Sequence, residues 1–274
     1  MPFQDVNLND GNKIPSIAYG TGTTRKDQDA TKYVTQALEV GFTHIDTAQI
    51  YHNEDSVGVA IQESGLPRSA LYITTKYSTD PIRQSIKASL RRLGLDYVDL
   101  YLIHHPMFVE PDFEGAWKEL EKIKEEGLAK SIGVSSFNLE QLQTIVRFSK
   151  IPPAVNQIEL HPYNYHKNKP LLEYSAKHGI VIEAFSSLAS ITKYPGGPVD
   201  APVNAAAKRR GVAPNQIIMA WVRAKGAVIV TTSSSENRLH EYLSAADIDP
   251  LTVGEIKAID EAGARGLPPH RGRF

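Results

Sequence analysis

GFTHIDTAQIYHNE, residues 41–54, is the stretch that decides the fold of this chain. Its apolar residues 43–45 predict a short strand that delivers Asp46 to its carboxyl end, and the loop that follows presents Tyr51. Catalytic groups collect at the carboxyl ends of parallel strands. Other strands that end in polar residues would therefore bring those residues to the same edge.

Two later stretches follow this pattern. Residues 71–75 are a β-rich run that ends in Lys76, and residues 98–103 are another that ends in His104 and His105. Because the carboxyl ends of parallel strands meet at one edge, an acid, a phenol, an amine and an imidazole are expected together there.

These four residue types suit proton transfer to a carbonyl oxygen. A free phenol has a pKa of about 10, so a nearby cation is needed to make it a good acid at neutral pH. Lys76 can supply that cation for Tyr51, and Asp46 would keep the lysine charged and in place. His104 could donate a hydrogen bond to the substrate oxygen. Each residue alone could be an ordinary strand-end residue that contacts a loop, but the ordered series favours a catalytic site.

Strand and helix patterns alternate from the first residues to the last. A hairpin is expected over residues 3–14, and the strand that follows it ends in a glycine-containing loop of Gly20, Thr21 and Gly22. The expected strands cover residues 17–19, 43–45, 71–75, 98–103, 131–134, 155–159, 181–185 and 228–230. The expected helices cover residues 29–40, 56–63, 80–93, 112–126, 138–148, 168–178, 201–210, 214–225, 236–245 and 252–262.

Eight strands that are each followed by a helix predict an α/β fold, a closed (β/α)8 TIM barrel with an N-terminal β-hairpin. No linker interrupts the pattern, so we expect residues 1–274 to form one domain. The sequence has no G-x-G-x-x-G turn, which argues against a doubly wound dinucleotide fold.

Composition narrows the classes of partner. The net charge is −1, from 30 basic and 31 acidic residues, so no overall field favours nucleic acid or anionic lipid. There are no cysteines, and no run approaches the roughly 18 apolar residues of a membrane helix. The first residues are polar and lack an apolar signal core. We expect a monomer of the cytosol that acts on a small molecule, with neither nucleic acid nor membrane as a partner.

At this point five segments identify a family. GFTHIDTAQIYHNEDSVGVAI, VDLYLIHHP, SIGVSSF, PAVNQIELHPY and TSSSENR occur in the order found in the aldo-keto reductases, which the chain resembles over nearly its full length. Within the family it is most similar in character to fungal ketone and conjugated polyketone reductases. The resemblance implies an NAD(P)H-dependent carbonyl reductase, with Tyr51 as general acid, Lys76 and Asp46 as its partners, and His104 orienting the carbonyl group.

The resemblance also implies a coenzyme site. Ser135 and Gln157 would bind the nicotinamide carboxamide, and Phe185 would stack on its ring where the family usually has tyrosine. Thr232 replaces the lysine that normally meets the 2′-phosphate, so NADPH is expected with a weaker preference over NADH. The full expected set is Gly20, Thr21, Gly22, Asp46, Ser135, Ser136 (asparagine in the family), Gln157, Phe185, Ser186, Leu188, Thr232, Ser233, Ser234, Asn237 and Arg238.

The expected substrate is a bulky carbonyl compound. Gly22, Ser78 and His105 stand where sugar-reducing members tend to carry tryptophan, which implies a wider and more polar pocket. The tail after residue 262 is short. Both features favour ketones, diketones, keto esters, keto lactones or aldehydes, bound near Tyr51 and His104, over small sugars.

Two other functions stay open at this level, because a fold alone does not define a function. One is a coenzyme-binding regulatory subunit without turnover, as in the family's potassium-channel β subunits. The other is a metal-dependent hydrolase, for which the candidate ligands are His44, His104, His105 and His161. No H-x-H or H-E-x-x-H pattern supports such a site.

Overall fold

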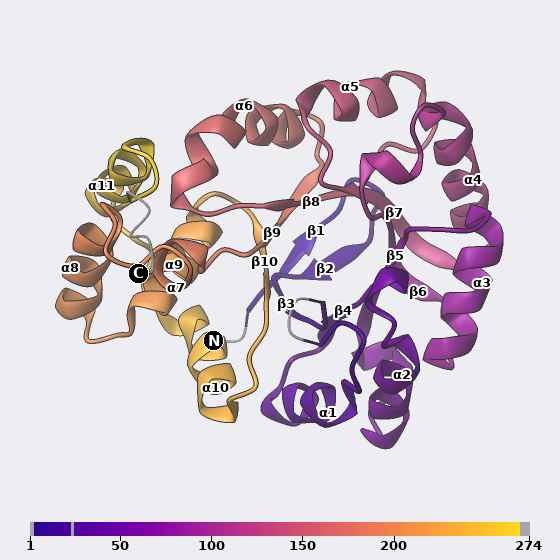
Figure 1. The fold of residues 1–274 in the computed structure, drawn as a ribbon, viewed down its shortest axis with the longest axis horizontal. Helices are drawn as coiled ribbons and strands as arrows, with labels where there is room; N and C mark the ends of the chain where they lie inside the picture. The colour runs from indigo at the N-terminus through magenta and orange to yellow at the C-terminus, as the bar shows by residue number, and fades with distance from the viewer. Residues whose placement is uncertain (1–2, 23–24, 269–274) are drawn as a thin grey trace, which may run out of the picture.

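The computed structural model describes residues 3–22 and 25–268. In this part of the chain eight parallel strands close into a barrel, in the order β10-β3-β4-β5-β6-β7-β8-β9. The helices lie outside the ring of strands (Figure 1). The barrel strands are β3 (Ile17–Gly20), β4 (His44–Asp46), β5 (Tyr72–Tyr77), β6 (Val98–Ile103), β7 (Ala129–Ser135), β8 (Val155–Glu159), β9 (Val181–Phe185) and β10 (Val228–Thr231). The predicted (β/α)8 barrel is confirmed.

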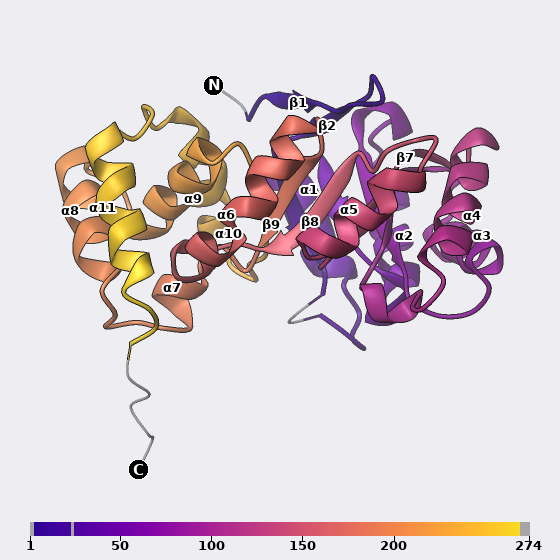
Figure 2. The ribbon, with the colours of Figure 1, turned by 90° about the horizontal axis from the view of Figure 1, so that it is seen from above.

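A separate antiparallel hairpin lies across one end of the barrel (Figure 2). It pairs β1 (Asp5–Asn7) with β2 (Lys13–Pro15), with Val6 opposite Ile14. Ile14 and Leu8 belong to one apolar cluster with residues of the barrel strands, so the hairpin closes the end at which the strands begin. The predicted N-terminal hairpin is also confirmed.

The inside of the barrel changes from apolar to polar along the strands. Successive side chains of a strand point to opposite faces, so residues two apart share a face. On β5, Tyr72 packs in an apolar cluster with Leu100 and Val155, whereas Thr74 and Lys76 follow on the same face. The apolar floor therefore supports a layer of buried polar groups beneath the other end of the barrel.

The helices mostly match the sequence pattern, with two differences. They are α1 (Thr31–Val40), α2 (Glu54–Glu63), α3 (Ile82–Leu93), α4 (Phe113–Glu125), α5 (Leu139–Phe148), α6 (Pro162–Lys177), α7 (Ala189–Thr192), α8 (Asp200–Arg210), α9 (Pro214–Ala224), α10 (Glu236–Ser244) and α11 (Val253–Ala264). The expected start of α6 at residue 168 is wrong, because Pro162 occupies the first helical turn and the backbone N–H of His161 donates to Asn164 Oδ1 (2.9 Å). The short helix α7 was not expected. None of the described helices is long and apolar enough to cross a membrane.

Candidate active site

The carboxyl ends of the barrel strands surround a cavity of about 590 Å³. Its walls are formed by residues from β3, β4, β7, β8, β9 and β10, by loops at this end of the barrel, among them the loop after β6, and by helices α7 and α10. Of the four expected catalytic residues, Asp46, Tyr51 and His104 line this cavity, and Lys76 lies fully buried next to Asp46. The structure thus brings the predicted acid, phenol, amine and imidazole together.

Lys76 and Asp46 form a buried ion pair. The Nζ atom of Lys76 lies 2.6 Å from Asp46 Oδ1 and donates to the carbonyl oxygen of Thr47 at 2.9 Å. Burial lowers the pKa of Lys76, but the charge and the hydrogen bond of Asp46, together with the charges of Tyr51 and Glu183, outweigh burial, and the net direction is upward. Lys76 therefore stays an ammonium ion although its side chain has no exposed surface.

The side chain of Tyr51 projects from a short 3-10 helix, Gln49–Tyr51, that follows β4. Its ring centroid is 5.2 Å from Lys76 Nζ. Burial raises the pKa of Tyr51, the charge of Lys76 opposes this rise, and the charge of Asp46 adds to it, with a net upward direction. The sequence indicated only the effect of the cation. In the folded chain Tyr51 keeps its proton at neutral pH, as a group that donates a proton must.

Tyr51 has its position because residue 22 lacks a side chain. A Cβ atom on Gly22 would lie 2.6 Å from Cζ and 2.9 Å from Oη of Tyr51. Such contacts are shorter than van der Waals distances, so the phenol and any larger residue at position 22 cannot both occupy these places. This glycine therefore sets the position of the Tyr51 phenol.

His104 is a neutral imidazole next to the phenol. The His104 and Tyr51 ring centroids are 5.4 Å apart in an edge-to-face arrangement. Burial, reinforced by the charge of Lys76, lowers the pKa of His104 to about 3. Its Nδ1 atom is 3.3 Å from Ser78 Oγ, and within the described residues Nε2 has no hydrogen-bond partner. Nε2 is therefore free for a ligand.

Ser78 and His105 do not line the cavity in the described part of the chain. Ser78 is buried, and its hydroxyl contacts His104 instead of the open space. His105 is exposed, and its Nδ1 accepts a hydrogen bond from the backbone N–H of Met107 at 3.2 Å. The sequence could not reveal that one side chain lies behind His104 while the other turns onto its own loop.

Most of the expected coenzyme residues line the cavity. They are Gly20, Gly22, Asp46, Ser135, Ser136, Gln157, Phe185, Ser186, Leu188, Thr232 and Arg238. Ser136 and Ser186 have φ angles of 62° and 55°, a left-handed conformation that is uncommon for serine and that clusters at functional sites. These two residues come directly after β7 and β9, so the backbone turns sharply where each strand reaches the cavity.

Four expected coenzyme residues lie outside the cavity wall. Thr21 is fully buried, and its hydroxyl bonds to Thr47 Oγ1 at 2.9 Å. Ser233 accepts a hydrogen bond from Tyr19 through its carbonyl oxygen at 3.1 Å. Ser234 and Asn237 are exposed beside the first turn of α10. These residues lie next to wall residues in the sequence, but sequence position could not show which side chains face the cavity.

Sequence reasoning missed part of the wall. Lys26 and Lys193 line the cavity, and with Arg238 they give it three cationic side chains, whereas Asp46 is its only carboxylate in the described chain. The other missed residues are Ser187, Ala189, Thr192, Ile229, Val230, Thr231 and Tyr242. For Ser187, Ile229, Val230 and Thr231 the available signal was their place in or just after predicted strands, where barrel enzymes bind ligands. Lys26, Thr192, Lys193 and Tyr242 lie farther along the chain, where no strand end pointed to them.

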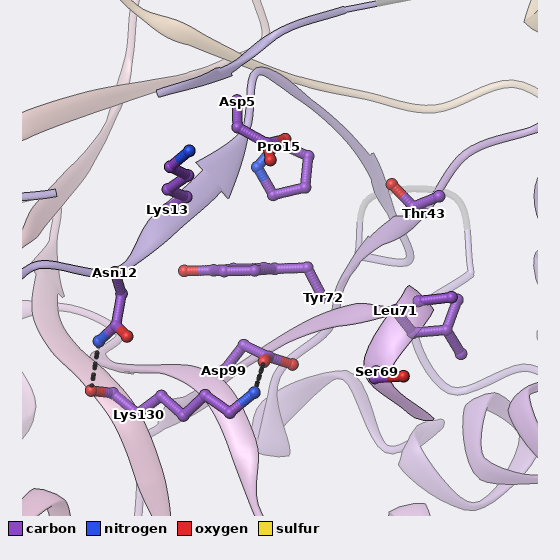
Figure 3. Close-up of a pocket in the computed structure, with 11 residues that line it drawn as sticks. Asp5, Asn12, Lys13, Pro15, Thr43, Ser69, Leu71, Tyr72, Asp99 and Lys130 are labelled. Carbon is purple, nitrogen blue, oxygen red and sulfur yellow. Dashed lines mark hydrogen bonds and ion pairs between the residues drawn. The ribbon is translucent and has the colours of Figure 1, made fainter. Parts of the chain in front are cut away.

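A second cavity, of about 330 Å³, lies at the opposite end of the barrel beneath the hairpin (Figure 3). Its acid Asp99 already bonds to Lys130 Nζ at 3.0 Å, Arg68 at 2.5 Å and the backbone N–H of Ile73 at 2.9 Å. These contacts join the beginnings of β5, β6 and β7, and they leave Asp99 paired with two cations. Asn12 of the hairpin donates to the carbonyl oxygen of Lys130 at 3.0 Å, so this cavity lies at the junction between the hairpin and the barrel.

The imidazoles considered as metal ligands do not form a site. His44 lies in the barrel interior, with Nε2 2.9 Å from Thr74 Oγ1, and His105 is exposed on its loop. Within residues 3–22 and 25–268, no three His, Cys, Asp or Glu side chains are grouped so that they could hold a metal ion.

The fold is that of a known class of enzyme. The model of the aldo/keto reductase family matches residues 16–264, and the chain belongs to this family of NAD(P)-dependent oxidoreductases. The chain is 39% identical over 277 residues to the NAD/NADP-dependent indole-3-acetaldehyde reductase of Schizosaccharomyces pombe, with 96% of each chain covered. It is 36% identical over 290 residues to the NADPH-dependent alpha-keto amide reductase of Saccharomyces cerevisiae, with 97% of this chain and 92% of the relative covered.

Two solved structures show the same fold. The aldo/keto reductase of Brucella melitensis is 37% identical with a TM-score of 0.85, over 95% of this chain and 99% of that chain. The Bombyx mori aldo-keto reductase in complex with NADP is 32% identical with a TM-score of 0.86, over 95% and 93%.

Proposed function

We propose that this protein reduces a ketone, diketone, keto ester, keto lactone or aldehyde to the alcohol with NADPH, and that Tyr51 is the general acid. The observation that carries the proposal is the convergence of Tyr51 and His104 on one wall of the cavity, with the Lys76–Asp46 pair directly behind the phenol. Family membership supports the reaction class.

The cavity wall fits the coenzyme. Gln157 and Ser135 offer polar atoms for a carboxamide, and Phe185 offers a ring face at the end of β9. Lys193 and Arg238 supply positive charge for phosphate groups. When bound, NADPH supplies the hydride.

The residues of the chain supply position and protons. His104 is neutral, so its free Nε2 can carry the hydrogen that orients the substrate carbonyl. Tyr51 donates its proton to the carbonyl oxygen as negative charge develops there, and the ammonium of Lys76 stabilises the resulting phenolate. Asp46 holds Lys76 throughout. The absence of a side chain at position 22 lets the phenol of Tyr51 occupy its place at the cavity wall.

The general acid is tested by Tyr51→Phe. We expect loss of carbonyl reduction by at least about a hundredfold, since general acids contribute about 10²–10⁴-fold. Coenzyme affinity, measured by calorimetry, should stay within about twofold, because the phenol is not needed to hold the carboxamide or phosphates. Tyr174→Phe on α6, whose ring stacks on His178, is the matched control and should keep full activity. Turnover retained by Tyr51→Phe would refute the assignment.

The wild-type assay also separates the reductase from a regulatory subunit. A panel of aldehydes, diketones and keto lactones, followed by loss of NADPH absorbance, should show turnover and rank the substrates. Absence of turnover on every substrate, together with coenzyme binding, would favour the subunit.

Preference for NADPH depends on Arg238 in this proposal. Thr232 provides no charge, so we expect Arg238→Ala to raise KM for NADPH about tenfold to a hundredfold, the range for a charge-assisted hydrogen bond, and to change KM for NADH little. Arg147→Ala, at an exposed arginine of α5, is the control and should alter neither value. Equal effects on both coenzymes would contradict a role in 2′-phosphate binding.

A further inference from the structure

A buried carboxyl that the proposed chemistry does not use lies inside the barrel below the cavity. Glu183 on β9 has no exposed surface, and it pairs in register with Gln157 on β8. Its Oε2 accepts a hydrogen bond from Gln157 Nε2 at 3.0 Å. Its Oε1 has no hydrogen-bond partner among the described residues.

Charged groups around Glu183 do not compensate a carboxylate. Lys76 is already bonded to Asp46, and His44, whose Nε2 is 3.9 Å from Glu183 Oε1, is fully buried. Burial lowers the pKa of His44 to about 4, so it is neutral. Burial, with the nearby charge of Asp46, raises the pKa of Glu183 to about 8. Glu183 is therefore a neutral acid at pH 7, and because Oε2 accepts from Gln157, its acid proton lies on Oε1.

The amide nitrogen of Gln157 is fully occupied. It donates to Asp46 Oδ2 at 2.8 Å as well as to Glu183 Oε2, so both of its hydrogens are used. Gln157 Oε1 has no partner within the described chain, and Gln157 lines the cavity. In the opposite orientation the amide oxygen would lie against the negatively charged carboxylate of Asp46, and the hydrogen bond to Asp46 Oδ2 would be lost.

We infer that Glu183 is a positioning residue which, together with Asp46, holds the Gln157 amide so that its oxygen faces the cavity as a hydrogen-bond acceptor. The group it selects is an amide N–H donor on the ring of the coenzyme. This inference rests on the proposed function, since it assigns a partner at the proposed nicotinamide end. It also links coenzyme recognition to the Asp46–Lys76 pair through one shared amide.

The test compares two ligands and three forms of the full chain. NADP⁺ carries the carboxamide, whereas its 3-acetylpyridine analogue carries a methyl ketone and lacks the N–H donor. Wild type, Glu183→Gln and Glu183→Met are titrated with each ligand by calorimetry. Gln keeps an oxygen acceptor at the same length, and Met keeps the length without one.

We expect Glu183→Met to weaken NADP⁺ binding about fivefold, the value of one neutral hydrogen bond, and to leave binding of the analogue unchanged. Glu183→Gln should prefer NADP⁺ over the analogue by the same factor as the wild type does. In steady-state assays Glu183→Met should raise KM for NADPH more than it lowers kcat. If the methionine variant does not fold, Glu183→Thr, a β-branched residue suited to a strand and too short to reach Gln157, replaces it.

Equal losses for both ligands, or no loss for either, would overturn the positioning role while the coenzyme assignment stood. A wild-type protein that bound neither ligand would overturn the coenzyme assignment and this inference with it.

Discussion

His104 is a histidine that burial has removed from its usual role as a switch near neutral pH. Its pKa is lowered to about 3, first by burial and then by the charge of Lys76. It is therefore uncharged across the physiological range. We expect kcat/KM for carbonyl reduction to show no change due to this imidazole between about pH 5 and pH 8. An apparent pKa near 6.5 in the rate profile, lost in His104→Gln, would show that the imidazole titrates.

Gly22 acts through the space it leaves. In Gly22→Ala the new methyl group would overlap the ring of Tyr51, so the phenol or the loop must move. We expect kcat/KM to fall by roughly tenfold to a hundredfold, because small displacements of a catalytic group are costly. The melting temperature should change little. Full activity in Gly22→Ala would mean that the phenol reaches its substrate from another position.

At this scale the sequence predicted identities better than orientations. Asp46, Tyr51, Lys76 and His104 could be predicted because strand ends of parallel sheets meet at one edge. The orientation of Ser78 toward His104 depends on side-chain packing across two strands, which no spacing along the chain encodes. The net rise in the pKa of the phenol depends on burial, which only the folded chain defines.

Helices α6 and α11 pack closely at a glycine. A Cβ atom on Gly263 would overlap the carbonyl oxygen of Pro162, a backbone atom that cannot turn away. We expect Gly263→Ala to lose about 1–3 kcal/mol of unfolding free energy, the range for overpacking. Gly254→Ala on the same helix is the control, since its nearest neighbour would be 4.0 Å away. Thermal denaturation of both variants measures this loss of stability. Equal stabilities of Gly263→Ala and Gly254→Ala would contradict the close packing of the two helices.

The elements were predictable where one periodicity dominates. All eight barrel strands were found within a few residues, because buried parallel strands are short apolar runs bounded by turns. The periodicity predicts a helix that begins only at residue 168, because the first turns of α6 are polar and Pro170 lies inside it. Both features hide a helix from a periodicity argument. The four-residue helix α7 is too short to show a period.

For the whole molecule, the polar layer inside the barrel makes stability depend on pH. The pKa of Glu183 is raised to about 8 by burial, so between its unfolded value near 4.5 and about pH 8 the folded chain binds the extra proton. The contribution of Glu183 to the free energy of unfolding is therefore fully present at low pH. It is lost as the pH rises through this window, by up to about 1.4 kcal/mol per pH unit. His44 acts in the opposite sense, since its lowered pKa of about 4 makes the fold lose stability as pH falls below about 6.5.

Glu183→Gln isolates the first effect, because the glutamine does not titrate and His44 is present in both proteins. We expect the melting temperature of the variant, relative to wild type, to rise by several degrees between about pH 6 and pH 8, since about 1 kcal/mol corresponds to roughly 2–4 °C in a chain of this size. The second arm uses about pH 4, where the carboxyl is protonated in the folded chain and largely so in the unfolded one. Near this pH the difference in melting temperature between the variant and wild type should stop changing. A difference that is constant from pH 4 to pH 8 would mean that Glu183 carries the same charge folded and unfolded, and that the barrel holds a carboxylate without a cation of its own.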